Sequence, residues 1–404
     1  MTTPERSVDE AIAELIATLP PVEDIERVPT RSALGRILAE DIAAPLDLPA
    51  FDNAAMDGYA LRAADLTLPA LREIGRALAG HAYAGRVAPG TCVRIMTGAP
   101  LPAGADTVVM EEDTVRDNGQ VRIVRAPPPG ANVRRRGEHI ARGDIVLASQ
   151  RHLRAADLGL AAAIGRTELP VMRRLRVGLL STGDELADPP APLSAGSSYD
   201  ANRPFLCASV ERTGFEAIDL GICADRSADL ERVLERALAQ RLDVVLVSGG
   251  AAQGDADIVR RAGGVRFIAL NIRPGRGIAV ANLAQADHVL TLLGLPGNAV
   301  AAFVMFHLVA RPVLLHLAGG VAAAPPSLPV PLASAVHVRG GRIDYRRACF
   351  VRDAGNTLAV APLKDQGSAM LRTVVEADAL IAVGPRAEYA AGEPVETIPL
   401  ATLD

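Results

Sequence analysis

Three short apolar runs between residues 174 and 320 constrain the fold of this 404-residue chain more than any other feature. RVGLLST at 176–182, LDVVLVS at 242–248 and HVLTLLG at 288–294 are typical of buried strands. Helical patterns lie among them: 202–213 and 227–240 fall between the first and second runs, and 298–317 follows the third. This alternation predicts an α/β domain with a mostly parallel sheet and helices on both faces.

The rest of the chain predicts other kinds of structure. Residues 7–19 place apolar side chains on one helical face behind a Ser7 cap. From about 50 to 138, short runs such as TCVRIM and QVRIVRA are separated by Gly and Pro, which favours a small β domain. Helical periodicity returns around 139–172, so we expect the β domain to be inserted into a helical region.

Composition excludes several classes of protein. Lys and Arg number 42 against 47 Asp and Glu, a net charge of −5 that gives no reason to expect nucleic-acid binding. The four cysteines and seven histidines lack the spacing of a structural zinc site. The first residues do not resemble a signal peptide, and the longest apolar run, at 299–310, is shorter than a membrane span. We therefore expect a soluble, cytoplasmic protein.

Polar residues follow each of the three predicted strands. TGDEL with Asp184 and Glu185 follows the first strand, GGAAQGDAD follows the second, and LPGN follows the third. The carboxyl ends of parallel strands meet at one edge of the sheet, where ligands bind. Glycines there allow close backbone approach, and free N–H groups can hold an anion. The candidates for binding in the second loop are Ser248, Gly249, Gly250 and Gly254.

Carboxylates in these loops would repel an anionic ligand unless a cation lies between them. Glu185, Asp255 and Asp257 carry the hard oxygen donors that Mg²⁺ prefers, which points to magnesium-dependent phosphate chemistry. The alternative is structural, because a Gly-rich loop after a strand is often only a tight turn. Asp225 and Asp257 could equally be helix caps.

Two further stretches carry polar chemistry. NIRPGRG places Arg273 and Arg276 around a rigid turn, where two guanidinium groups could hold phosphate or another tetrahedral oxyanion. A hairpin turn with solvated arginines is the alternative. The stretch PAFDNAAMDGYAL, at residues 49–61, places Asp52 and Asp57 between apolar residues. Carboxylates in such a stretch are expected neither in a regular helix nor in a buried strand.

Together these motifs resemble one family. FDNAAMDGYA, RIMTGAP, RRRGEHI, STGDEL, YDANR, SGGAAQGDAD, RPGRG, GLPGN and QGSAM occur in the order found in molybdopterin molybdenumtransferase of the MoeA type, which is related to the E domain of gephyrin. The resemblance runs from about residue 7 to residue 400. It implies an elongated helical region from residues 1–48 and 139–172, a β domain at 49–138, a MogA-like three-layer α/β domain at 173–322 that binds molybdopterin, and a C-terminal β barrel at 323–404.

The resemblance also implies a homodimer with an active site shared between subunits. The site would lie between the α/β and C-terminal domains of one subunit and the β domain of the other. In this arrangement Asp57 and Thr97 would reach the partner's site. A molybdopterin adenylyltransferase would supply the substrate and client molybdoenzymes would receive the product.

The implied reaction inserts molybdate into adenylylated molybdopterin, with Mg²⁺ as cofactor and AMP as a product. By motif, Glu185, Asp225 and Asp257 would hold Mg²⁺ or position water. The residues implied to bind molybdate or phosphate oxygens are Arg273, Arg276, Arg347 and Ser368, and Pro296 would shape the pocket.

The chain departs from the family pattern at several positions. Ala252, Ala269, Ala299 and His139 replace polar, basic, proline and acidic residues that are common in the family, and arginines replace the lysines at 273 and 276. Most of these changes fall on the oxyanion side of the implied site. An alternative is therefore a divergent paralogue that carries molybdopterin or the finished cofactor without catalysing insertion.

Overall fold

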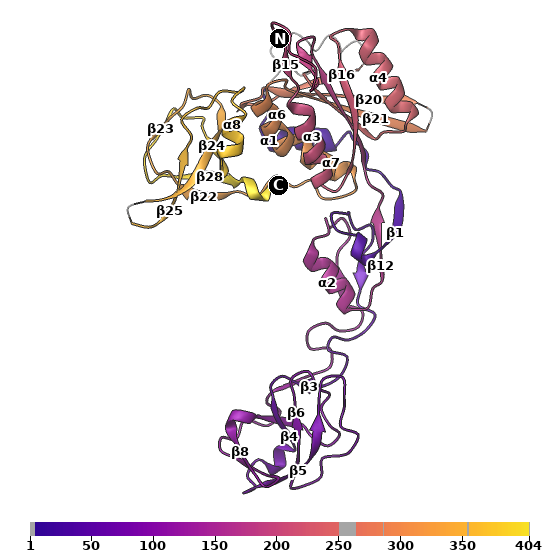
Figure 1. The fold of residues 1–404 in the computed structure, drawn as a ribbon, viewed down its shortest axis with the longest axis vertical. Coiled ribbons are helices and arrows are strands. Elements are labelled where there is room, and N and C mark those ends of the chain that lie inside the picture. Colours follow the sequence, from indigo (N-terminus) through magenta and orange to yellow (C-terminus); the bar gives the residue numbers. More distant parts are fainter. Residues whose placement is uncertain (1–4, 250–263, 286, 354, 404) are drawn as a thin grey trace. The chain divides into compact units, whose positions relative to one another are not determined.

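A computed structural model describes residues 5–249, 264–285, 287–353 and 355–403 of the chain (Figure 1). The chain divides into two compact units. Unit 1 comprises residues 1–39, 150–154 and 169–404, and unit 2 comprises 40–149 and 155–168.

The centre of unit 1 is a six-stranded sheet with the order β16-β13-β17-β21-β20-β18. Its first four strands are parallel, whereas β20 and β18 are antiparallel to their neighbours. Ser181 pairs with Ser248, and Ser248 with Leu295, so the carboxyl ends of three strands are level. The strands are β13 (Arg176–Thr182), β16 (Glu216–Cys223), β17 (Val244–Ser248), β18 (Arg266–Ala269), β20 (Gly277–Gln285) and β21 (His288–Leu295).

Alternate side chains of these strands face two different hydrophobic layers. On one face, Leu179 and Leu246 pack with residues of α3 (Asn202–Arg212), α6 (Ala299–Met305) and α7 (Arg311–Leu317). On the other face, Leu180 and Val245 pack with α4 (Ser227–Ala239). Successive residues of a strand point to opposite faces, so the continuous apolar runs are buried on both sides. The predicted three-layer α/β domain is therefore observed.

One long helical stretch, Ala299–Leu317, passes through the core of unit 1. It consists of α6 (Ala299–Met305), a π-helical turn at Phe306–Ala310 and α7 (Arg311–Leu317). It is longer than the apolar run seen in the sequence, and is the one helix among the described residues whose length and composition would suit a membrane span. Because 89% of its most apolar window is buried inside the structure, we describe it as a core helix.

His307 lies on the π-helical turn and is 2% exposed. Its ring is surrounded by Phe205, Phe303 and Phe306, with centroids 6.0, 4.6 and 5.1 Å away. Neither ring nitrogen has a hydrogen-bond partner among the described residues. Burial, with a smaller contribution from Arg311, lowers the pKa of His307 to about 3.

We expect His307 to make the folded state sensitive to acid. The unfolded chain binds a proton at this residue below a pKa near 6.5 and the folded chain only near 3, so stability is lost as pH falls from 6.5 towards 3. Between pH 7 and pH 5, the free energy of unfolding of the wild-type chain should fall by about 2 kcal/mol more than that of a His307→Leu variant. Urea unfolding of both proteins at the two pH values measures this difference; equal losses would contradict it.

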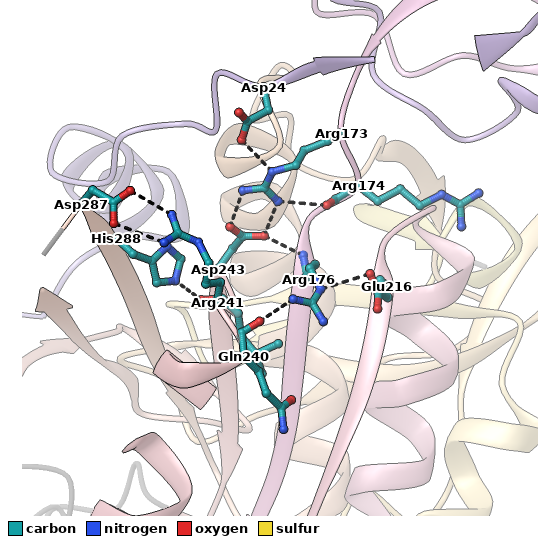
Figure 2. Close-up of polar contacts among 11 residues, drawn as sticks. Asp24, Arg173, Arg174, Arg176, Glu216, Gln240, Arg241, Asp243, Asp287 and His288 are labelled. Carbon is teal, nitrogen blue, oxygen red and sulfur yellow. Dashed lines mark hydrogen bonds and ion pairs between the residues drawn. The ribbon is translucent and has the colours of Figure 1, made fainter. Parts of the chain in front are cut away.

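The amino-terminal ends of β13 and β17 are held by a partly buried ion pair (Figure 2). The two terminal nitrogens of Arg173 donate to the two carboxylate oxygens of Asp243, each at 2.7 Å, and the Arg176 N–H donates to the same carboxylate at 2.8 Å. Arg173 Nε also donates to Asp24 at 2.8 Å. Asp243 is 7% exposed, and its hydrogen bonds with Arg173 raise the pKa of that guanidinium. This pair connects the segment before β1 (Ile25–Pro29) to the sheet.

The remaining elements of unit 1 form a second sheet and several short pieces. The second sheet has the order β19-β24-β26-β28-β22, and β25 also pairs with β24. Helix α1 (Val8–Ile16) is capped by Ser7, whose hydroxyl accepts the Glu10 N–H at 3.2 Å, while the Glu10 carboxylate accepts the Ser7 N–H at 2.8 Å. The other bounds are β12 (Glu168–Met172), β14 (Leu186–Ala187), β15 (Ser198–Tyr199), β19 (Ile272–Arg273), β22 (Leu328–Pro331), β23 (Val336–His337), β24 (Ile343–Arg352), β25 (Leu358–Pro362), α8 (Arg372–Glu376), β26 (Ala379–Val383), β27 (Glu388–Tyr389) and β28 (Pro394–Pro399).

Unit 2 is built on a six-stranded sheet with the order β7-β4-β6-β5-β9-β8. Its two apolar clusters include Ala60 and Val93 in one and Tyr59 and Leu71 in the other. The bounds are β2 (Ile42–Ala43), β3 (Asn53–Ala54), β4 (Gly58–Leu61), β5 (Leu71–Ala77), β6 (Thr91–Ile95), β7 (Thr107–Met110), β8 (Thr114–Asp117), β9 (Gln120–Ile123), β10 (Val133–Arg134), β11 (Ile145–Leu147) and α2 (Ala155–Ala163).

The flanking regions differ from the expected mainly helical structure. Residues 1–48 and 139–172 contain the helices α1 and α2, but also the strand pairs β1-β12 and β2-β11. Short runs such as ELPVM combine a proline with β-branched and apolar residues, which suits a strand better than a helix. The four-part division and the C-terminal barrel remain predictions.

Candidate oxyanion and metal site

The loops after β17 and β21 are tied together by one side chain at the start of α3. Asn202 Nδ2 donates to the Ser248 hydroxyl at 2.7 Å and to the Gly297 carbonyl at 2.6 Å. Asn202 and Ser248 are both buried. Ser248 was predicted to bind a ligand. In the structure its hydroxyl accepts this hydrogen bond from Asn202, which fixes the end of β17.

Gly249 is a position that no other residue would fill easily. Its φ is +107°, and an added Cβ would lie 2.5 Å from the Thr182 carbonyl oxygen. Its N–H donates to the Leu295 carbonyl at 3.2 Å. The backbone thus crosses closely over the ends of two neighbouring strands, as expected for a loop that approaches a ligand.

Two of the three predicted metal ligands lie in loops that leave adjacent strands. Glu185 follows β13 and Asp225 follows β16, and these strands pair through Thr182 and Cys223. The Asp225 N–H donates to the Asp184 carboxylate at 3.2 Å, which joins the two loops. The third ligand, Asp257, lies outside the described residues, as do Gly250, Gly254, Asp255 and Ala252.

Among the described residues, no group of three or more acidic, histidine or cysteine side chains is arranged so that it could hold a metal ion. Glu185 and Asp225 nevertheless fit Mg²⁺ by donor chemistry, because this ion is commonly held by one or two carboxylates together with water and phosphate oxygens.

A cavity of about 480 Å³ lies in unit 1 beside the loop after β21. It brings together four residues proposed from the sequence, Arg273, Arg276, Pro296 and Ser368, and adds Arg342. None of the described residues that line it is acidic. Three guanidinium groups, a hydroxyl and apolar walls such as Phe267 and Ile272 suit a compact oxyanion attached to a larger organic molecule.

Arg273, one of the lining residues, has a donor without a partner among the described residues. Its Nη1 atom is buried and has no hydrogen-bond partner within the described part of the chain. Its Nη2 atom makes only a long contact, 3.4 Å, to the Gly340 carbonyl. A buried charged donor without a partner is costly.

Arg342 was missed by the sequence analysis. It comes close to the 273–276 turn because β19 and β24 pair in parallel, with Ile272 opposite Ile343. No local spacing relates residues so far apart. The pair of glycines before it, Gly340 and Gly341, both with positive φ, is the one local sign of an unusual turn there.

Arg347 lies apart from the lining of this cavity. It is 1% exposed, and it donates to the Thr373 hydroxyl at 3.0 Å and to the Asp365 and Gly367 carbonyls at 3.3 and 3.0 Å. These bonds hold the loop that carries Ser368. In this arrangement Arg347 shapes the loop, whereas the sequence analysis expected it to bind the oxyanion directly.

In unit 2, Asp57 and Thr97 form a pair. Asp57 Oδ1 accepts hydrogen bonds from the Thr97 N–H and the Thr97 hydroxyl, both at 2.7 Å. These two bonds lower the pKa of Asp57. Both residues are exposed, so an ionised, oriented carboxylate lies on the surface of unit 2.

The other carboxylate of the FDNAAMDGYA stretch has a structural role. Asp52 accepts a hydrogen bond from Arg135 Nη1 at 2.7 Å and another from the Arg136 N–H at 2.8 Å. Arg136 Nε also donates to Asp47 at 2.6 Å. Asp52 thus anchors the RRRGEHI turn and leaves Asp57 as the candidate functional group.

Comparison with known proteins covers nearly the whole chain. Residues 6–165 match the MoeA N-terminal region (domains I and II), 178–316 match a probable molybdopterin binding domain, and 329–400 match the MoeA C-terminal region (domain IV).

Full-length relatives show the same similarity. Molybdopterin molybdenumtransferase of Haemophilus influenzae is 34% identical over 401 residues, covering 97% of this chain and 98% of the relative. Molybdopterin molybdenumtransferase 2 of Mycobacterium tuberculosis is 35% identical over 398 residues, covering 93% and 95%. The crystal structure of a molybdopterin biosynthesis moeA protein from Pyrococcus horikoshii superimposes with a TM-score of 0.81 at 27% identity, covering 98% of this chain and 100% of that one. The chain belongs to the MoeA family.

Proposed function

We propose that this protein is an enzyme of molybdenum cofactor biosynthesis that inserts molybdenum from molybdate into adenylylated molybdopterin, in the cytoplasm. The names of its relatives support the reaction class. The observation in the structure that carries the proposal is the cavity lined by Arg273, Arg276 and Arg342, with no acidic side chain among the described residues that line it.

The cavity provides the oxyanion end of the proposed site. Arg273 and Arg276 would bind molybdate oxygens through charge-assisted hydrogen bonds, and the Ser368 hydroxyl would donate a further hydrogen bond to the same ion. Pro296 and Phe267 would exclude water from one side. Arg347 would act indirectly, through the loop that positions Ser368.

The loops after β13, β16 and β17 provide the nucleotide end of the proposed site. Glu185 and Asp225, with Asp257, would hold Mg²⁺, and Gly249 and the glycines after it would let the backbone approach the phosphates. Bound Mg²⁺ would neutralise charge on the pyrophosphate link. A water molecule would cleave that link to release AMP. The two thiol groups of molybdopterin would give their protons to one oxo group of molybdate, which leaves as water while both sulfurs bind molybdenum.

A homodimer would complete the site. In the proposed dimer, the ionised carboxylate of the partner's Asp57, held by its Thr97, would face the loops that carry Glu185 and Asp225. Mixing an Asp57→Ala protein with a Glu185→Ala protein tests this arrangement, because each mixed dimer would contain one intact site. After subunit exchange, about a quarter of wild-type activity should return; no recovery would reject the shared site.

The reaction itself is tested with purified protein, adenylylated molybdopterin, Mg²⁺ and molybdate. We expect AMP release that depends on both molybdate and Mg²⁺. Binding of the pterin without molybdate-dependent AMP release would reject the transferase and favour the carrier, the alternative suggested by Ala252, Ala269 and Ala299.

A further inference from the structure

The first described residues of the chain lie against the arginine-lined cavity. The Arg6 N–H donates to the Ala269 carbonyl at 2.8 Å, and the Asn271 N–H donates to the Arg6 carbonyl at 2.8 Å. Arg6 and Leu270 thus form an isolated parallel bridge next to β18 and β19. This pairing fixes the position of Glu5 beside the turn that precedes β24.

Glu5 engages Arg342, one of the three arginines of the cavity. Arg342 Nη2 and Nε donate to the two carboxylate oxygens of Glu5, the Nε contact being 3.4 Å. The Asn271 amide, in the orientation that satisfies both of its polar atoms, donates to Glu5 Oε2 and to the Gly341 carbonyl, each at 3.1 Å. The side chains of Arg342 and Glu5 are 21% and 37% exposed, so the pair is only partly hydrated.

The edge of Arg342 that Glu5 occupies is one that an oxyanion would use. The Nε and Nη2 atoms of a guanidinium form a planar pair of donors that binds two oxygens of a carboxylate, a phosphate or a similar anion. Among the described residues, no ion pair is seen at Arg273 or Arg276, whereas Arg342 pairs with Glu5. Glu5 is therefore the carboxylate placed to compete with a ligand of this cavity.

We propose that Glu5 limits oxyanion affinity by competing with the bound oxyanion for Arg342. The inference rests on the proposed oxyanion site and extends it to the start of the chain. While Glu5 is bound to Arg342, it neutralises one of the three positive charges of the cavity. It also occupies one pair of guanidinium donors. A molybdate ion that contacts this edge of Arg342 must displace the carboxylate, which favours release and restrains the binding of other anions.

Direct binding of sodium molybdate to the full chain, measured by titration calorimetry without pterin, tests the competition. A Glu5→Gln variant keeps the size of the side chain and removes its charge, and we expect it to bind molybdate about tenfold more tightly. The matched control is Glu23→Gln, an exposed glutamate outside the cavity lining, which should leave the affinity unchanged. Unchanged or weaker binding by Glu5→Gln would overturn the proposal.

A double variant tests whether Glu5 acts through Arg342. In an Arg342→Met background, Glu5→Gln should no longer tighten binding, because the contested donors are absent. A tenfold gain that persists there would overturn the proposed route. No molybdate binding by the wild-type chain would also overturn it, whereas binding without AMP release would reject only the transferase reaction.

Discussion

A Glu185→Gln variant should lose molybdate-dependent AMP release by at least about a hundredfold, the scale expected when a ligand of a reacting metal or a positioned carboxylate is removed. The substitution keeps the shape of the side chain and removes the charge that would hold Mg²⁺ near the end of β13. The loss of turnover relative to the wild-type chain is measured as steady-state AMP release at saturating molybdate, over a range of Mg²⁺ concentrations.

Two comparisons make this result specific to the metal side of the site. Molybdate binding by Glu185→Gln should remain near the wild-type value, because the arginine-lined cavity does not include Glu185. Glu216→Gln, an exposed glutamate at the opposite end of neighbouring β16, should retain wild-type turnover. Full turnover by Glu185→Gln would remove this residue from the proposed chemistry.

The largest expected effect on stability comes from Asp243→Ala. This change leaves the partly buried guanidinium of Arg173 without its two-oxygen acceptor and removes the acceptor of the Arg176 N–H (Figure 2). Loss of one partner of a buried ion pair typically costs about 3–5 kcal/mol. Guanidinium chloride unfolding followed by circular dichroism should show the transition of unit 1 shifted to lower denaturant.

The same network supplies the control for this prediction. Asp287 accepts hydrogen bonds from Arg241 at 3.2 and 3.3 Å, but both side chains are mostly exposed. Asp287→Asn should therefore leave the unfolding midpoint close to that of the wild type. Equal shifts from the two variants would show that burial of Asp243 does not set the strength of its interaction.

The central sheet could be predicted from the sequence because its strands are buried on both faces. The runs that became β13, β17 and β21 are continuously apolar, and α3, α4 and the 299–317 helix matched their expected ranges within one or two residues. Strand β16 gave a weaker signal, because it is an edge strand and mixes Glu216 and Asp219 with apolar residues. The antiparallel strands β20 and β18 were missed for a similar reason, since β20 ends in the partly polar run ANLAQ.

The site was predictable where its residues lie within one motif and unpredictable where tertiary pairing brings them together. Arg273 and Arg276 belong to one turn, and the cavity contains both. Arg342 enters through the pairing of β19 with β24, and Glu5 through the bridge that its neighbour Arg6 makes to Leu270, so no local pattern connects them. Arg347 shows the converse, because its motif fits the family but its guanidinium is buried among loop carbonyls.

The bonds made by Asn202 carry a mechanical consequence. The Asn202 amide donates hydrogen bonds both to Ser248 at the end of β17 and to Gly297 after β21. The two loops therefore cannot move independently without breaking one of these hydrogen bonds. A ligand that displaces the loop after β17 should therefore also displace the loop after β21, next to Pro296.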